Sequence, residues 1–458
     1  MASSQLVSLQ TLSSFNSERA HLQESDKALK KVLIIAYYFP PMGLSGVQRT
    51  LKFVKYLPEF GWKPIVLTIT PTAYYAYDET LLSELDETQI EIHRTQTKDI
   101  TKAAASLTSS RQFKVPGEFM RRMMSLVSQT FFIPDNKIGW KKFALQKADE
   151  IIAEHGNIDL IFSTAPPFTS HLIALALRKK HQLPTVVDFR DPWVENPLHF
   201  YPTPFHRRTH QRLEEQVVLG VDKIVTVNRA LKEHLLRVYR EKLTHKDVVI
   251  VSHGYDAKDF ESVPKARANT GKFRFLHSGT LHSSERSPKP FFLGLKKAIE
   301  KNADLAQKVE ARFVGLFPTE YTKFAKSLGI DGLIQVEGYK SHHDALAENF
   351  QADVLWATQS DVRHIATITQ SKLFEYVACE RTLFGVVPEG ASRQFILEAN
   401  GVVAHPNNPD EIAEKILVLF EHWKSGTLPL PLKEVAEKYD RRNLTMQLVR
   451  EFEQMLFV

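Results

Sequence analysis

The stretch TITQSKLFEYVACERTLFGVVP, residues 367–388, predicts a short helix followed by a buried strand. Apolar residues at positions 373, 374, 377 and 378 share one face of that helix, while Lys372 and Glu375 fall on another face. A strand-like run at 352–357 comes before it, so we expect the helix to start at the carboxyl edge of a sheet. Free backbone N–H groups at such a place suit a phosphate. Many solvated helices carry a Glu and a Lys, so this pattern alone does not predict a binding site. The position of the helix among the other predicted elements is what favours a function.

The second half of the chain repeats the same alternation of strand and helix. Each predicted strand is separated from the next by a helical stretch, which is typical of parallel strands joined by helical crossovers. The predicted strands are residues 273–277, 311–315, 334–338, 354–357, 383–387 and 402–404.

The first half follows the same plan. A buried strand at 32–38 leads into a loop with Gly43, and Gly46 opens a helix that Gly61 ends. The other predicted strands are 64–69, 159–163, 185–189, 223–227 and 248–252, with helices at 168–180 and 213–219. We therefore predict an α/β protein with two doubly wound Rossmann-like domains that face each other across a central cleft.

The predicted divisions follow from these runs. They are a flexible leader at 1–30, an N-terminal domain at 31–256, a polar linker at 257–272, a C-terminal domain at 273–430, and a C-terminal helix at 431–458 placed to pack across both domains.

Composition narrows the class of protein. A chain of 458 residues, 43% apolar and 24% charged, suits two globular domains. The net charge of +6 favours anionic partners without choosing among phosphorylated small molecules, nucleic acid and membranes. The single cysteine, Cys379, excludes an internal disulfide and indicates a reducing compartment. We find no apolar run of membrane-spanning length and no secretory signal, and we predict a cytoplasmic protein.

Two kinds of site are not expected. The loop before the first helix carries Gly43 and Gly46 only, and residues 68–70 end the second strand where a dinucleotide site needs an acid, so an NAD enzyme is not predicted. His342 and His343 are adjacent, so they diverge on a helix, and we expect no metal and no cofactor.

The region 102–142 is basic and studded with large apolar residues. Two interpretations stay open. An amphipathic basic helix of this kind can rest on an anionic membrane, or it can pack its Met and Phe side chains against its own domain.

Several stretches together resemble glycosyltransferase family 4, the retaining nucleotide-sugar enzymes of the GT-B fold, over roughly residues 31–425. The matching stretches are AYYFPPMGLSGVQR (36–49), PDNKIGW (134–140), STAPPFTSHL (163–172), DFRDPW (188–193), HSGTL (277–281), the basic turn 285–289, KLFEYVA (372–378) and VPEG (387–390).

The resemblance implies a donor site between the domains. The glycine loop would lie over the diphosphate, because glycines let backbone N–H groups approach a phosphate, although a tight turn without a ligand is the alternative. Glu375 would hold the ribose hydroxyls. The implied donor-binding residues are Gly43, Gly46, Gly279, Thr280, Ser371, Lys372, Leu373 and Glu375.

The implied catalytic residues are Arg286, Lys289, Asp191 and Arg190. Arg286 and Lys289 would neutralise a departing diphosphate, unless Arg286 merely pairs with Glu285 in a solvated loop. Asp191 and Arg190 stand where many family members carry a histidine. They would act on the donor or acceptor, or form a structural ion pair.

The expected activity is transfer of a sugar from a nucleoside diphosphate sugar to a hydroxyl of a glycan or lipid-linked acceptor, with retention at the anomeric carbon. The resemblance also implies a role in cell-envelope polysaccharide synthesis at the inner face of a membrane. No nucleic-acid partner is expected. Thr367 stands where the family pattern has the first of two glutamates, so the resemblance does not identify the donor sugar. A non-hydrolysing nucleotide-sugar epimerase and a catalytically silent scaffold are the alternatives.

Overall fold

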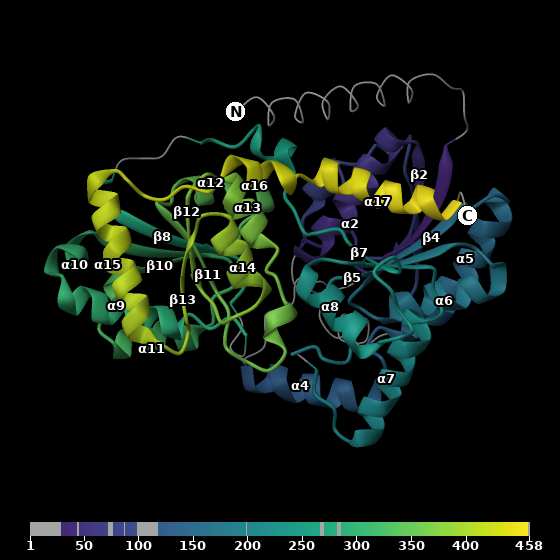
Figure 1. Cartoon of the computed structure of the whole chain (residues 1–458), viewed down its shortest axis with the longest axis horizontal. Helices are drawn as coiled ribbons and strands as arrows, with labels where there is room; N and C mark the ends of the chain where they lie inside the picture. The colour runs from purple at the N-terminus through teal and green to yellow at the C-terminus, as the bar shows by residue number, and fades with distance from the viewer. Residues whose placement is uncertain are drawn as a thin grey trace.

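The computed structural model describes residues 29–43, 45–71, 77–86, 88–98, 118–197, 199–265, 270–281 and 285–456. Two α/β domains lie side by side, and a helix near the C-terminus runs over the N-terminal domain (Figure 1). Each domain is built around one parallel sheet. The predicted fold class is confirmed.

The N-terminal sheet has the strand order β3-β2-β1-β4-β5-β6-β7. Continuous apolar runs such as VLII at the end of β1 are fully buried, because helices cover both faces of a parallel sheet. Its strands are β1 (Lys30–Ile35), β2 (Trp62–Ile69), β3 (Glu91–Thr95), β4 (Leu160–Ala165), β5 (Thr185–Phe189), β6 (Lys223–Thr226) and β7 (Val248–Ile250). Its helices are α2 (Ser45–Tyr56), α4 (Glu118–Phe131), α5 (Lys141–His155), α6 (Thr169–His181), α7 (Pro204–Val218) and α8 (Arg229–Val238).

The C-terminal sheet has the order β10-β9-β8-β11-β12-β13. Its strands are β8 (Phe273–Ser278), β9 (Val309–Val314), β10 (Ile334–Gly338), β11 (Val354–Thr358), β12 (Thr382–Val386) and β13 (Val402–Ala404). The helices that follow are α9 (Lys289–Lys301), α10 (Ala303–Lys308), α11 (Thr319–Ser327), α12 (His342–Phe350), α13 (Lys372–Ala378), α14 (Ala391–Glu398), α15 (Pro409–Ser425), α16 (Lys433–Lys438) and α17 (Arg441–Leu456).

The structure differs from the sequence-based prediction in several places. Strand β3 was not predicted. The helix expected at 213–219 is the end of α7, which starts earlier because Pro204 occupies its first turn. The segment expected as a polar linker contains a short 3-10 helix, Ala257–Phe260, and its Phe260 and Val263 are buried in a core cluster of the C-terminal domain.

The chain crosses between the domains twice, and the two crossings touch. Tyr255 N donates to Tyr439 O at 3.1 Å, and Arg441 N donates to Tyr255 O at 2.8 Å. Gly254 is needed here, since a Cβ at this position would lie 2.2 Å from Tyr439 O. The expected single C-terminal helix is broken at this crossing into α16 and α17.

The last segment packs on both domains. Val435 of α16 belongs to a core cluster of the C-terminal domain, whereas Leu448 and Phe452 of α17 are buried in the core of the N-terminal domain. Figure 1 shows α17 lying along the N-terminal domain beside α2. Among the described residues, no helix combines the length and the apolar character needed to cross a membrane.

Candidate donor-binding and catalytic site

The first turn of α13 places Lys372 against the end of β8. Lys372 Nζ lies 2.8 Å from His277 Nε2, and His277 Nδ1 lies 3.0 Å from Trp356 O. A carbonyl oxygen only accepts, so His277 Nδ1 carries the proton and Nε2 accepts from Lys372. Burial, and then the positive charge of Arg286, hold the pKa of Lys372 well below its ordinary value, although Glu375 opposes them.

One turn further along α13, Glu375 meets a histidine from α12. His342 Nε2 lies 3.1 Å from Glu375 Oε1, and both side chains are about three-quarters buried, with exposed fractions of 22% and 24%. Burial alone would lower the pKa of His342, but Glu375 and Asp259 outweigh it and raise that pKa. The same pair keeps the pKa of Glu375 below its usual value against the effect of burial. Glu375 is therefore a carboxylate that already has one partner.

Arg286 sits on a loop that is fixed on both sides to the end of β11. Ser360 N donates to Glu285 O at 2.8 Å, and Thr358 Oγ1 donates to Ser287 O at 2.8 Å. The guanidinium acts electrostatically on Lys372 in its own domain and on Asp191 in the other. It therefore lies where the two domains meet.

On the N-terminal side, Arg190 holds three backbone carbonyls. Its Nε donates to Ala165 O at 3.0 Å, its Nη2 donates to Pro166 O at 2.5 Å, and its Nη1 donates to Gly46 O. Arg190 thus joins the loops that follow β1 and β4. The neighbouring Asp191 has a raised pKa because of burial, although Arg190 and Arg286 both oppose that rise.

The two glycines of the first loop differ in how tightly they are packed. A Cβ at Gly43 would lie 2.9 Å from the hydroxyl of Tyr339, which donates to Gly43 O at 3.3 Å from the other domain. A Cβ at Gly46 would meet only Arg190 Nη1, at an ordinary 3.6 Å. Packing in the free protein therefore explains a glycine at 43 but does not explain one at 46.

The remaining predicted residues occupy different surroundings. Gly279 has φ of +115°, and a Cβ there would lie 3.0 Å from Lys372 Nζ, so this turn needs a glycine. Thr280 follows it and is half-buried, as is Ser371 at the start of α13. Leu373 is buried in the core, and its N–H donates to Gln370 O at 3.1 Å.

Lys289 is not brought to this cluster. Its Nζ lies 5.5 Å from the ring centre of Phe324 and 5.9 Å from that of Tyr321, and the residue is exposed. The structure therefore brings together Gly46, Arg190 and Asp191 from one domain with Gly279, Arg286, Lys372 and Glu375 from the other. We call this set the interdomain cluster.

The sequence reasoning missed the residues that brace the cluster. Arg49 forms a buried fork with Asp188, with nitrogen to oxygen distances of 2.9 and 2.8 Å, and it also donates to Ser252 O at 2.6 Å. Both residues lie in motifs quoted above, GVQR and DFRDPW, but sequence alone does not show that these motifs meet. Lys52 is likewise buried, and its Nζ lies 2.5 Å from Asp259 and 2.9 Å from Asp256.

Thr367, which replaces a family glutamate, contributes a backbone contact between the domains. Asn228 Nδ2 donates to Thr367 O at 2.8 Å and to Thr369 Oγ1 at 2.9 Å. Nearby, His364 Nδ1 lies 3.1 Å from Glu195 Oε2. The loop after β11 therefore attaches directly to the N-terminal domain.

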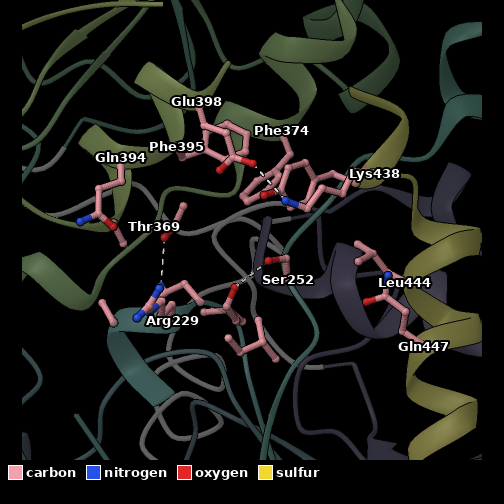
Figure 2. Close-up of a pocket in the computed structure, with 16 residues that line it drawn as sticks. Arg229, Ser252, Thr369, Phe374, Gln394, Phe395, Glu398, Lys438, Leu444 and Gln447 are labelled. Atoms are coloured by element: carbon pink, nitrogen blue, oxygen red, sulfur yellow. Dashed lines mark hydrogen bonds and ion pairs between the residues drawn. The ribbon is translucent and has the colours of Figure 1, made fainter. Parts of the chain in front are cut away.

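A cavity of about 420 Å³ lies beside this attachment (Figure 2). Arg229 and Ser252 line it from the N-terminal domain, and Phe374, Gln394 and Lys438 line it from the other side. None of the predicted site residues lines this cavity. It adjoins the interdomain cluster through α13, whose Phe374 faces the cavity while Glu375 faces His342.

Comparisons with known proteins support the fold described above. The family model described as Glycosyltransferase Family 4 matches residues 107–259, about a third of the chain. No curated protein matches the sequence. Solved structures match over almost the whole chain. Sucrose-phosphate synthase from Thermosynechococcus elongatus has a TM-score of 0.63 at 12% identity, covering 93% of this chain and 99% of its own.

Two further structures give the same picture. HepE from Anabaena in complex with UDP has a TM-score of 0.61 at 13% identity, with 93% of this chain and 100% of that chain covered. A glycosyltransferase from Rickettsia africae has a TM-score of 0.61 at 17% identity, with 94% and 99% covered. At these identities the likeness establishes the fold.

The fold and the family match together define the class. The architecture is GT-B, and the chain is glycosyltransferase family 4-like, as the motifs predict. The predicted enzyme class, the glycosyltransferases, is confirmed.

Proposed function

We propose that this protein transfers a sugar from a nucleoside diphosphate sugar to an acceptor hydroxyl, with retention at the anomeric carbon. The observation that carries the proposal is the interdomain cluster, in which Arg286 acts electrostatically on Lys372 of its own domain and on Asp191 of the opposite domain. Solved structures of HepE, which shares the fold, hold UDP and UDP-glucose, so uridine nucleotides are the first donors to test.

Stabilisation of the leaving diphosphate would supply most of the rate enhancement. Negative charge builds up on the diphosphate as the bond to the sugar breaks, and prepositioned cations act most strongly on such charge. The Arg286 guanidinium can bind two phosphate oxygens at once, and Lys372 adds a point charge. These side chains take the place of a cation in this proposal, so we propose that transfer needs no metal.

The other members of the cluster have distinct tasks in this proposal. Glu375 accepts hydrogen bonds from the ribose hydroxyls and shares its carboxylate with His342. Arg190 positions the glycine loop through Gly46 O, which leaves Asp191 to contact the donor sugar or the acceptor. Gly46 lets the loop come close to the diphosphate, since its own packing does not require a glycine.

We further propose a lipid-linked acceptor at an anionic membrane surface. Apolar side chains are exposed where α4 meets α7: Phe131 is 74% exposed and Phe205 is 67% exposed. The two helices are joined there, because His206 Nε2 lies 3.1 Å from Thr130 O (Figure 1). Arg208, three residues further along α7 and on the same side of the helix as Phe205, is exposed as well. Apolar and basic groups on one face suit an anionic bilayer. This location is consistent with cell-envelope synthesis at the cytoplasmic face.

The activity can be tested with a panel of nucleotide sugars, each incubated with the purified protein with and without lipid or glycan acceptors. Acceptor-dependent release of nucleoside diphosphate is the expected result, and it should persist in EDTA. An altered nucleotide sugar would instead identify an epimerase. No turnover of any donor would favour a scaffold.

Membrane contact can be tested by sedimentation with vesicles of phosphatidylcholine alone or mixed with phosphatidylglycerol. We expect binding to the mixed vesicles only. The double variant Phe131→Ser, Phe205→Ser should lose it, while Val336→Ser, at a 47% exposed site in the C-terminal domain, should not. Equal sedimentation of the double variant and the wild type would contradict the proposed surface.

A further inference from the structure

Three side chains meet at the outer edge of the N-terminal sheet, among residues that the proposed activity does not use. Glu91 and His93 alternate on β3 and therefore point to the same face of the strand. His155 is the last residue of α5, which packs against β2 and β3 and ends at Gly156 with φ of +66°. The end of this helix brings His155 over the face that carries Glu91.

The potential ligand atoms of these residues converge. One carboxylate oxygen and two imidazole nitrogens all lie within 4.8 Å of one another, and His155 Nε2 is 3.2 Å from Glu91 Oε2. Tetrahedral zinc holds nitrogen and oxygen ligands at about 2.0–2.2 Å, which places ligand atoms about 3.3 Å apart. Small changes of side-chain rotamer would therefore close the set around one ion.

The same three atoms lack other hydrogen-bond partners. Glu91 Oε2, His93 Nε2 and His155 Nε2 are each shielded from solvent without a hydrogen bond. Glu91 Oε2 is ion-paired with Lys63 Nζ at 3.3 Å, but the two imidazole nitrogens have no hydrogen-bond partner, and buried polar atoms are normally satisfied. A shared cation would satisfy all three at once.

We propose that Glu91, His93 and His155 form a binding site for a divalent transition metal, zinc above all, which fastens the edge strand β3 to the end of α5. Two imidazoles and one carboxylate favour zinc over magnesium or calcium, which prefer all-oxygen sites. Water would fill the fourth position. The ligands come from elements other than those of the interdomain cluster, so the site is separate from donor binding.

The charges around the site include a competitor. Lys63 Nζ on β2 lies 3.3 Å from Glu91 Oε2, and Lys147 on α5 is close enough to act on His93. Lys147 is itself paired with Glu150 at 3.1 Å, and Glu154 also faces His93. Zinc must therefore displace Lys63 from Glu91. A second group, Glu84, Asp256 and Asp259, carries no such proposal, because Lys52 and Lys55 already occupy it.

The site can be tested by isothermal titration calorimetry, in which zinc is titrated into the EDTA-treated full-length protein. We expect one tight equivalent in the wild type, and affinity at least about 100-fold lower in the double variant His93→Ala, His155→Ala. The expected direction for Lys63→Met is tighter binding. Replacement of the exposed His343 in the C-terminal domain by Ala serves as the matched histidine control and should change nothing.

A second readout guards against misfolding. Glu91→Gln keeps the size of the side chain, and its circular dichroism spectrum should match that of the wild type while zinc affinity falls at least about tenfold. Zinc should also raise the melting temperature of the wild type and leave that of the double variant unchanged, since a ligand that binds only the folded state stabilises it. Absence of zinc binding, or unchanged affinity in the double variant, would overturn the proposal.

Discussion

Lys372 gives the most demanding prediction, because its charge should change when a nucleotide binds. In the free protein its amine is buried against His277, and burial together with Arg286 holds its pKa well below the ordinary value. A diphosphate placed beside this amine reverses the balance. Two opposite unit charges about 4 Å apart interact by roughly 4 kcal/mol at an effective dielectric constant of about 20. That energy favours the charged amine, so a bound diphosphate raises the pKa of Lys372.

The direction in which affinity changes with pH follows from the number of protons bound in the free protein and in the complex. The complex holds a charged Lys372, and the free protein holds a neutral one over the interval between the two pKa values. Binding therefore takes up about one proton per nucleotide, and affinity falls as the pH rises through that interval. The slope should be about tenfold per pH unit, or about 1.4 kcal/mol.

Calorimetric titration with UDP measures both quantities. The phosphate of the ligand has its own ionisation near pH 6, so the titrations run from about pH 7 to about pH 9, in pairs of buffers with different heats of ionisation. Lys372→Arg, with a permanent charge, should bind UDP without proton uptake, and Lys372→Met should bind weakly and show a flat pH dependence. Wild-type binding without proton uptake, or an unchanged slope in Lys372→Met, would refute the reasoning.

Three further changes test the site and its support. Arg286→Ala should lower turnover about 100-fold in the nucleotide-release assay. The control Lys297→Ala, which removes an exposed ion pair with Asp410, should not lower it. Equal turnover in the wild type and both variants would remove Arg286 from the mechanism. Gly46→Ala should keep the wild-type melting temperature but bind UDP weakly, and Gly43→Ala should melt earlier because its Cβ meets Tyr339; normal UDP binding by Gly46→Ala would show that the loop does not touch the diphosphate. Lys52→Met leaves Asp259 without its lysine partner, and leaves Glu84 and Asp256 with Lys55 alone, so it should cost about 3–5 kcal/mol in urea denaturation; a loss below about 1 kcal/mol would contradict that role.

The strands were predictable where burial is continuous. β5 has the predicted bounds, since TVVDF is buried throughout, and β13 also matches. The edge strand β10 matches as well although it is mostly exposed, because the alternation of strand and helix indicated its position. β3 was missed because only one of its five residues, EIHRT, is apolar, whereas the edge strand β10, IQVEG, has apolar residues at alternate positions. A partly exposed strand carries no continuous apolar signal, and its polar residues resemble a loop.

The candidate site was predictable where strand ends impose proximity. Residues that follow parallel strands share one edge of a sheet, which is how Arg286, Lys372 and Glu375 could be grouped in advance. Their partners could not be found this way. Lys372 meets His277 from 95 positions away, and Glu375 meets His342 from 33 positions away.

Lys289 shows the limit in the other direction. It is three residues from Arg286, yet it is the first residue of α9, and its side chain extends over Tyr321 and Phe324 of the neighbouring helix. A short separation along the chain does not fix the direction of a side chain when a helix begins between the two residues. The predicted contact of Lys289 with the diphosphate remains a prediction.

The position of α17 constrains the order in which the molecule can be assembled. Residues up to β7 leave the ribosome long before Leu448 and Phe452, which fill part of the core beneath β1 and α2. The N-terminal domain is thus synthesised first, but its core is completed last, when α17 packs on it. During translation its sheet must wait with an uncovered apolar surface until the whole second domain has been made, and separate expression of the two halves would leave that surface without its cover.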